Sequence, residues 1–498
     1  GYSEMISLSI LIPLVAGIVI LLWREPAKDS RFAQRNPLIA IAVTLLSFFS
    51  AIILQKRFAA GYGEAQLREV WWTITGSGIN FSFALDGISM PLFLVTAFLF
   101  LIAALFSYSV HRVPSVPLGK TFWGMLLVLE ATVLGVFSAW NFVVFFIFWE
   151  LFLVPITVLI WLYGLEERKK AALNFFIYTF VSSAFMLAAF AAIVYYIPRI
   201  GADFDLRTTF APEVQGIHPD KQRILFLFFV IAFLVKMPVF PFHAWLPLTH
   251  TQAPLGSLLL SGLFLKLGSY GLLRFVTPNF TGVIAEWGQI FMYLGLASMF
   301  YGAFAAYRQK SFRNVIAYSS LAHMGLMLTA IFAQHEYALT GVIIQNVGHS
   351  LANALLFVVV VMHLARNKSD DLGTIAAPSS TFYWITFSIA LFSAIGVPGT
   401  IGFVGEFLML LGISYRSWLL AALAVLTLVF SAAYMLRLFH KVRAQTPDTT
   451  WRPTTIERLC MGLLVVAILW FGIAPGFVGE NARSSAKTLS TVSPGVGR

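Results

Sequence analysis

The sequence predicts an all-α polytopic membrane protein with about fourteen transmembrane helices. The 498-residue chain is 59% hydrophobic and only 11% charged, whereas a soluble domain usually carries about 25% charged residues. Apolar stretches long enough to cross a bilayer recur along the whole chain. No polar stretch is long enough for a separate soluble domain, so residues 1–498 form a single predicted membrane domain.

Windows of about 20 apolar residues give the predicted spans in chain order. They lie near 6–23, 37–55, 86–108, 121–139, 141–163, 171–197, 224–242, 255–275, 283–306, 312–334, 337–364, 382–413, 417–440 and 457–478. Proline removes a backbone donor and clashes with the preceding turn, so it breaks a helix. We therefore expect the seventh span to break at Pro238 and Pro241, and the twelfth to break at Val397-Pro-Gly399.

The two predicted breaks occupy corresponding places in two blocks of five spans. Each lies fourth in its block when the blocks cover residues 121–275 (helices 4–8) and 283–440 (helices 9–13). Corresponding broken helices in two halves are typical of transporters built from inverted repeats. The sequence therefore predicts two inverted five-helix repeats.

Positive charge is unevenly shared between the predicted loops. Lys and Arg concentrate on one side, in loops near 24–35, 112–120, 168–170, 308–313, 366–368 and 437–458. The richer side is expected to face the cytoplasm, which places both termini on the opposite, outer side of the membrane. This topology accounts for the net charge of +11 without a nucleic-acid partner. The single cysteine, Cys460, excludes an internal disulfide or an iron–sulfur cluster held by this chain alone.

Two lysines lie within predicted spans. Lys236 directly precedes the break in the seventh span, and Lys266 lies in the eighth. A charge at that depth costs about 2.5–3.5 kcal/mol on insertion scales and usually serves a function. Non-helical backbone at membrane depth is tolerated only inside protein or beside a watery cavity. Together these features predict an ion path.

A carboxylate, Glu150, lies near the middle of the fifth predicted span. Opposite charges 4 Å apart attract by up to about 4 kcal/mol at an effective dielectric constant of about 20. Bringing Glu150 close to Lys236 would therefore favour the charged forms of both, and separating them would release a proton. This is the behaviour that a proton pump requires, and the alternative is a static buried ion pair.

Further polar side chains extend the candidate path. Lys266, His323 and His349 are candidate proton carriers, because histidine exchanges protons near neutral pH, and Glu406 would end the path with a carboxylate. The remaining candidates are Glu130, as a second acidic site or a packing partner, and His243, His250 and His363. Haem is another hypothesis, since His349 and His363 are 14 residues apart on one helix. It requires a matching pair, for which the sequence offers His323 and His335.

Several motifs resemble the antiporter-like membrane subunits of respiratory complex I (NADH–quinone oxidoreductase) and the related large subunits of multi-subunit cation/proton antiporters. The motifs are Phe83-Ala-Leu-Asp-Gly-Ile-Ser-Met90, Trp149-Glu-Leu151, Phe233-Leu-Val-Lys-Met-Pro-Val-Phe-Pro-Phe-His-Ala-Trp-Leu-Pro247, His250-Thr-Gln-Ala-Pro254, Leu265-Lys-Leu-Gly268 and Ile316-Ala-Tyr-Ser-Ser-Leu-Ala-His-Met-Gly325. The complex I family includes L-type and N-type subunits, which have lysine at the corresponding place in the twelfth helix. Another branch of the family has glutamate there, and its segment resembles Gly402-Phe-Val-Gly-Glu-Phe407. The resemblance covers nearly the whole chain.

The resemblance implies a proton-translocating subunit of NADH:quinone oxidoreductase driven by quinone reduction elsewhere in the complex. Glu150 would pair with Lys236, Lys266 and the histidines would connect two half-channels, and Glu406 would be the terminal proton site. FMN, iron–sulfur clusters and quinone are expected in other subunits, and no cofactor or metal on this chain. The L-type and N-type subunits are the expected neighbours within the bilayer. The alternatives are a subunit of a cation/proton antiporter and a mainly structural membrane module.

Overall fold

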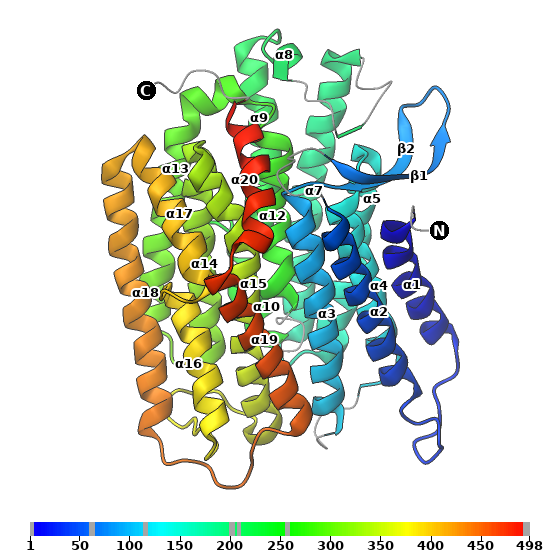
Figure 1. Cartoon of the computed structure of the whole chain (residues 1–498), viewed down its shortest axis with the longest axis vertical. Coiled ribbons are helices and arrows are strands. Elements are labelled where there is room, and N and C mark those ends of the chain that lie inside the picture. Colours follow the sequence, from blue (N-terminus) through cyan, green and yellow to red (C-terminus); the bar gives the residue numbers. More distant parts are fainter. Residues whose placement is uncertain are drawn as a thin grey trace.

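The computed structural model describes residues 4–58, 65–112, 118–198, 205–206, 211–253 and 259–491. In Figure 1 these residues form one bundle whose long helices run roughly along a common axis. Eleven helices of the described part are long and apolar enough to cross a membrane. Parts of the predicted loop near 112–120 and of the connection between the sixth and seventh predicted spans, the start of the eighth predicted span and Pro254 of one motif lie outside the described residues.

The helices of the first half overlap the first eight predicted spans. They are α1 (Met5–Leu22), α2 (Arg35–Arg57), α3 (Ser89–Arg112), α4 (Lys120–Ser138), α5 (Phe142–Leu151), α6 (Leu153–Tyr163), α7 (Arg168–Tyr196), the short α8 (Ala211–Val214), α9 (Pro219–Lys236), α10 (Trp245–Gln252), η2 (Leu260–Phe264), α12 (Leu265–Gly271) and η3 (Leu272–Val276). The elements η2 and η3 are π-helical turns. Lys266 therefore lies on a single α-helical stretch between two wider turns.

The second half contains the remaining predicted spans. They are α13 (Thr281–Tyr307), α14 (Phe312–Ala333), α15 (Glu336–Asn367), α16 (Thr381–Ile395), α17 (Ile401–Arg416), α18 (Trp418–Ala444) and α19 (Thr455–Ile473), followed by α20 (Gly476–Thr491). The all-α membrane fold is thus confirmed. The number of membrane crossings stays a prediction, because the seventh, eighth and twelfth predicted spans correspond to interrupted helices.

Both expected helix breaks are present. Helix α9 ends at Lys236, and non-helical backbone containing Pro238 and Pro241 separates it from α10. Helix α16 ends at Ile395, where Gly396 has a φ of 88°. This left-handed conformation suits glycine, which has no Cβ to clash with its own carbonyl. The helical backbone is therefore interrupted directly after Lys236 and, as shown below, beside Glu406.

Two elements, a β-hairpin and the helix α20 (Gly476–Thr491), lie almost wholly outside the predicted spans. Strands β1 (Gln66–Ile74) and β2 (Ile79–Leu85) form an antiparallel hairpin. Its turn contains Gly76 and Gly78, whose φ angles are 80° and 73°. Helix α20 packs against α15 and α19. In Figure 1 the hairpin and most of α20 lie toward the same end of the bundle, where α1 also begins.

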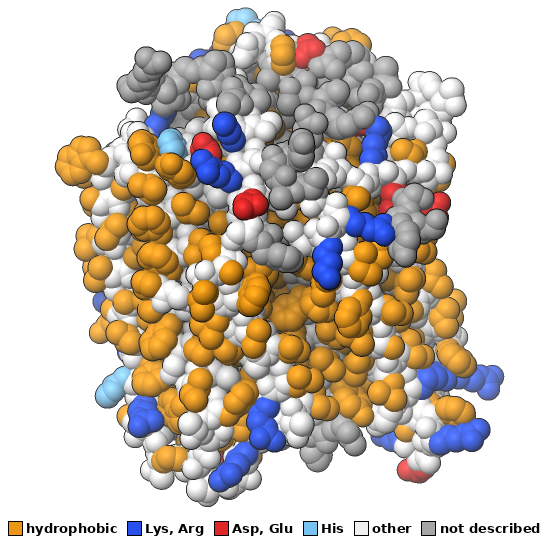
Figure 2. Space-filling view, viewed as in Figure 1, with side chains coloured by type: hydrophobic (Ala, Val, Ile, Leu, Met, Phe, Trp, Pro, Cys, Tyr) orange, Lys and Arg blue, Asp and Glu red, His pale blue; other side chains and the backbone are white. Residues whose placement is uncertain are grey.

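The surface fits a membrane protein. On the face that Figure 2 draws, hydrophobic side chains cover the middle of the molecule and most charged side chains lie toward its two ends. In the interior, α14 and α15 are almost wholly surrounded by other helices. Because these two helices carry His323 and His349, the candidate site lies in the most protected part of the fold.

Candidate functional site

Lys236 occupies a cage of aromatic rings. Its side chain is fully buried at the end of α9, and its Nζ lies 3.9 Å from the ring centroid of Trp149, 4.8 Å from that of Phe152 and 5.4 Å from that of Phe264. The Nζ atom makes no hydrogen bond with any described residue. The faces of aromatic rings attract cations through their quadrupole. The cage therefore holds the ammonium without a hydrogen-bonding partner.

Trp149 is itself held in place. Its indole Nε1 donates a hydrogen bond of 3.1 Å to the Oγ of Ser183 on α7, and its ring packs edge-on against Phe233 at 5.8 Å. Both contacts fix the orientation of the indole over Lys236. Since Trp149 and Glu150 are neighbours on α5, the ring and the carboxylate reach the lysine from the same helix.

Glu150 is half-buried and does not form the hydrogen-bonded pair that the resemblance implies. Its Oε1 is enclosed but makes no hydrogen bond with a described residue. The carboxylate is still close enough for its charge to act on Lys236. In this conformation the lysine is thus held by the cage, with the carboxylate nearby but not in direct contact.

Lys266 contacts His349 directly. Its Nζ lies 2.5 Å from Nδ1 of His349, and both side chains are buried. Helix α12, which carries Lys266, approaches the broken end of α9 closely at Gly268. A Cβ placed on Gly268 would lie 2.5 Å from both the backbone N of Met237 and the carbonyl oxygen of Phe233. The absence of a side chain there lets the two lysine-bearing segments pack together.

Lys266 and His349 begin a row of buried ionisable side chains, called the row below, which continues through His323 to Glu406. The rings of His349 and His323 have centroids 5.3 Å apart, and His323 Nδ1 lies 3.6 Å from Glu406 Oε1. Glu406 is buried, and its Oε2 lies against the second helix break. A Cβ placed on Gly396 would overlap that oxygen. The helix break and the terminal carboxylate are therefore parts of one structure.

Small polar side chains surround this row. Ser269 donates a hydrogen bond of 2.7 Å to Asn346 Oδ1, and Asn353 donates one of 2.6 Å to the Oγ of Ser320. These bonds join α12, α15 and α14 at the level of the lysine and histidines. Buried polar groups need such partners, because an unsatisfied group in a low-dielectric interior is costly.

The remaining candidates divide into two groups. His250 on α10 is buried and close enough to Lys266 for their charges to interact, so it belongs beside the row. Glu130 is buried on α4 and faces Ser47 of α2. His243 is half-buried and packs against Phe240 and Tyr301. Neither Glu130 nor His243 contacts the row among the described residues.

His363 and His335 also have their own partners. His363 Nε2 lies 2.6 Å from the Tyr383 hydroxyl, about 21 Å along α15 from His349 by helix geometry. His335 caps the start of α15 by accepting a hydrogen bond from the Tyr337 backbone, and its ring stacks on Tyr415 at 4.4 Å. The four histidines therefore do not form the two facing pairs that the haem hypothesis requires.

Sequence reasoning missed the aromatic cage and the link between Gly396 and Glu406. The adjacent Trp149-Glu150 pair pointed to the cage, but 15% of the chain is aromatic, so a tryptophan beside a charge had no special weight. The position of Glu406 ten residues after Gly396 was visible in the sequence. Only the fold shows that the intervening turn brings them together.

Comparison with known proteins identifies relatives along the whole chain. Residues 139–431 match the family of NADH:quinone oxidoreductase/Mrp antiporter transmembrane proteins. Subunit M of NADH-quinone oxidoreductase from Rickettsia felis is 33% identical over 496 residues, which cover 97% of this chain and 98% of that protein. The matched family region contains Glu150, Lys236 and every residue of the row.

Solved structures have the same fold. A chain of respiratory complex I from Thermus thermophilus with bound NADH has a TM-score of 0.87 and 28% identity, and the match covers 98% of this chain and 100% of that one. A chain of the Mrp complex from Dietzia has a TM-score of 0.82 with 18% identity, covering 99% and 98% of the two chains, and shows similarity of fold alone. The chain therefore belongs to the antiporter-like membrane subunits of respiratory complex I, as a subunit of the M type.

Proposed function

We propose that this chain moves protons along Glu150, Lys236, Lys266, His349, His323 and Glu406, driven by quinone reduction elsewhere in NADH:quinone oxidoreductase. The observation that carries the proposal is the unbroken sequence of contacts from Lys266 through both histidines to Glu406. These contacts are 2.5 Å, 5.3 Å between ring centroids, and 3.6 Å. Every group in that sequence can take up and release a proton.

The Lys266–His349 contact supports direct transfer. Two nitrogens 2.5 Å apart share one proton, because one must donate and the other accept. When the lysine holds the proton, Nδ1 of His349 is the acceptor, and transfer leaves a neutral amine beside an imidazolium. Rotation of the ring or an intervening water then carries a proton across the longer steps to His323 and Glu406.

The aromatic cage around Lys236 supports a step in which Glu150 controls how tightly Lys236 holds its proton. The ammonium lies over the ring of Trp149 without a hydrogen bond to a described residue, and Glu150 is close enough for its charge to act on it. Approach of the carboxylate strengthens the hold of Lys236 on its proton, and withdrawal weakens it. A change at Glu150 is thereby passed toward Lys266, which is carried two residues beyond the cage residue Phe264.

The relatives support membership of a multi-subunit membrane complex, and the loop charges support the orientation. We infer that the chain lies in a bacterial inner membrane, with both termini outside, between the L-type and N-type antiporter-like subunits. FMN, iron–sulfur clusters and quinone would belong to other subunits, which carry the electron transfer. This chain contributes the proton path and the electrostatic response of Glu150 and Lys236.

The test uses the intact complex in proteoliposomes. Glu150→Gln and Lys236→Ala are each expected to lower NADH-driven acidification at least tenfold and to slow the coupled electron transfer, while the complex still assembles on a native gel. Normal pumping in either variant contradicts the proposal. His363→Gln is the matched control, because His363 is buried on α15 but lies outside the row.

The main alternative is a cation/proton antiporter subunit, because the family matched by residues 139–431 includes Mrp antiporter proteins as well. It predicts that acidification depends on Na⁺. Our proposal predicts the same rate of NADH-driven pumping in sodium-free potassium buffer.

A further inference from the structure

An apolar groove lies against α15, the helix that carries His349. It has a volume of about 250 Å³ and lies between α2, α3, α15, α19 and the start of α20. Its lining includes Phe48, Ile52, Phe98, Ala467, Phe471 and Val478. Helices α2, α3, α19 and α20 lie toward the viewer in Figure 1, and the same view in Figure 2 shows hydrophobic side chains over the middle of this face. The groove therefore opens toward the lipid phase.

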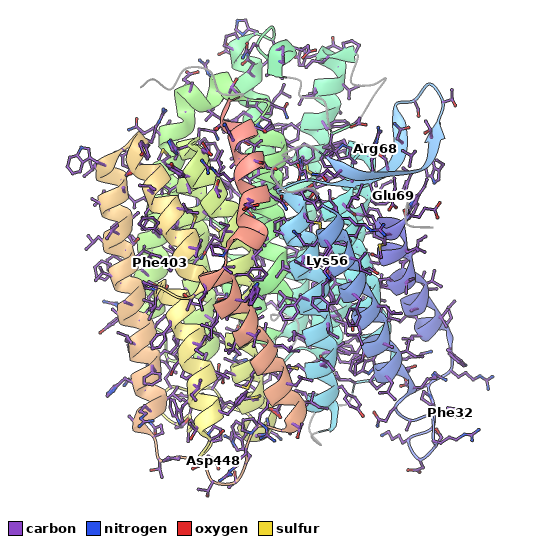
Figure 3. All side chains as sticks on the ribbon, viewed as in Figure 1. Phe32, Lys56, Arg68, Glu69, Phe403 and Asp448 are labelled. Atoms are coloured by element: carbon purple, nitrogen blue, oxygen red, sulfur yellow. The ribbon has the colours of Figure 1, made fainter. Side chains whose placement is uncertain are left out.

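A lysine stands at one end of this groove. Lys56 follows the lining residue Ile52 by four positions on α2, so the two lie on the same face of the helix, one turn apart. Lys56 is exposed near the C-terminal end of α2. Figure 3 places it between α2 and α20, at the upper margin of the hydrophobic band seen in Figure 2. The lysine thus lies about one helical turn beyond the apolar groove along the axis of α2.

We propose that the groove binds an anionic phospholipid, with an acyl chain between α2, α3 and α19 and the phosphate at Lys56. The shape favours an acyl chain over a protein helix, because a helix with its side chains is about 10–12 Å wide and the groove is small. Within a bilayer, close packing rather than the hydrophobic effect distinguishes one apolar occupant from another. The rings of Phe48 and Phe98, whose centroids are 5.4 Å apart, supply such a packing surface.

The charges at the rim favour an anionic headgroup on the α2 side. Across the groove, α20 carries Glu480 and Arg483 beyond Val478, and Arg483 is already paired with Glu336 at 2.9 Å. Lys56 is the exposed cation one helical turn from the lining residue Ile52. Basic residues at the membrane surface attract anionic lipids over zwitterionic ones. The bound lipid would join the N-terminal helices to the C-terminal ones on this face.

Photo-crosslinking of the purified complex tests this proposal. The complex is placed in phosphatidylcholine nanodiscs containing a small fraction of phosphatidylglycerol with a diazirine on one acyl chain, irradiated and digested. Peptides of α2, α3 and α19 that line the groove should carry most of the label on this chain. Diazirine-labelled phosphatidylcholine at the same fraction should label them about fivefold less, as expected for one lysine near the headgroup.

Three variants separate charge from shape. Lys56→Gln should lower labelling by phosphatidylglycerol about fivefold, and Ala467→Trp should abolish it by filling the groove. Lys441→Gln, which removes an exposed charge from the last turn of α18, should leave it unchanged. Equal labelling by the two lipids, no effect of Lys56→Gln, or cross-links to a neighbouring subunit in place of lipid would each overturn the assignment.

Discussion

The two buried lysines have different surroundings, and the difference suits the different roles that we propose for them. Lys236 is held by aromatic faces and has no hydrogen bond with a described residue, whereas Lys266 shares a short contact with His349. A lysine without a fixed hydrogen-bond partner can move toward a carboxylate or away from it at low cost. A lysine joined to an imidazole is instead arranged to transfer a proton. We therefore propose that Lys236 controls the movement of protons and that Lys266 passes a proton to His349.

Replacing Trp149 tests the cage. Trp149→Leu keeps an apolar side chain but removes the ring face, whose attraction for a desolvated cation is about 2 kcal/mol. NADH-driven proton pumping should fall roughly tenfold, whereas electron transfer in the presence of an uncoupler should fall much less. Trp149→Phe, which restores a ring face, should recover part of the pumping. Pumping by Trp149→Leu at the wild-type rate would show that the ring has only a packing role.

At the residue scale, the sequence was sufficient to find the ionisable groups but not their pairing. A lysine or glutamate inside a long apolar stretch is conspicuous because it is costly there. Its partner depends on side-chain direction and on neighbouring helices that are distant in sequence. For this reason Lys266, His323, His349 and Glu406 were found, while the cage around Lys236 was not expected.

At the element scale, the broken helices bring non-helical backbone to the charged groups. The break after α16 places Gly396 against the carboxylate of Glu406, and the break after α9 follows Lys236 directly. The sequence predicted both breaks because proline acts locally on the helix. It did not predict the π-helical turns around Lys266, which depend on packing. The β1–β2 hairpin was missed although residues 79–85 alternate between apolar and small or polar side chains, the pattern of a strand.

Gly396→Ala tests whether the second break positions Glu406. The added methyl group would overlap Oε2 of Glu406, so the carboxylate must move away from His323. We expect proton pumping to fall at least tenfold. Both Gly396 and Gly399 have positive φ, 88° and 95°, and alanine in either position costs about 1–2 kcal/mol of backbone strain.

Gly399→Ala is the matched control for this strain, because no atom of the described residues lies within 4 Å of a Cβ placed on Gly399. It should lower the thermal stability by a similar amount but leave most of the pumping intact. Equal pumping losses in the two variants would mean that backbone strain, rather than displacement of Glu406, is responsible.

At the scale of the whole molecule, one membrane domain was predicted, and the described residues form one bundle. Length and composition determine this, since apolar helices of bilayer length have to pack beside one another. The inverted repeats at residues 121–275 and 283–440 stay a prediction, as does the orientation in the membrane. The repeats were predicted from the symmetric positions of the two helix breaks, and the orientation was predicted from the loop charges. Neither prediction rests on a contact within the fold.

Cysteine labelling tests the orientation. The native Cys460 is buried, so a new surface cysteine can be followed with a membrane-impermeant maleimide. Ser77→Cys, in the hairpin turn, should react in intact spheroplasts, and Asp448→Cys, between α18 and α19, should react only after the membrane is opened. The reverse pattern would contradict the orientation drawn from the loop charges.

The most direct test of the central claim is the number of protons translocated per NADH oxidised by the reconstituted complex containing Lys266→Leu. This substitution interrupts the contact with His349 while keeping an apolar side chain in the buried site. If the row carries protons, the ratio falls below that of the wild type, and His363→Gln leaves it unchanged. An unchanged ratio in Lys266→Leu would contradict the account, because protons would then cross the membrane without this row.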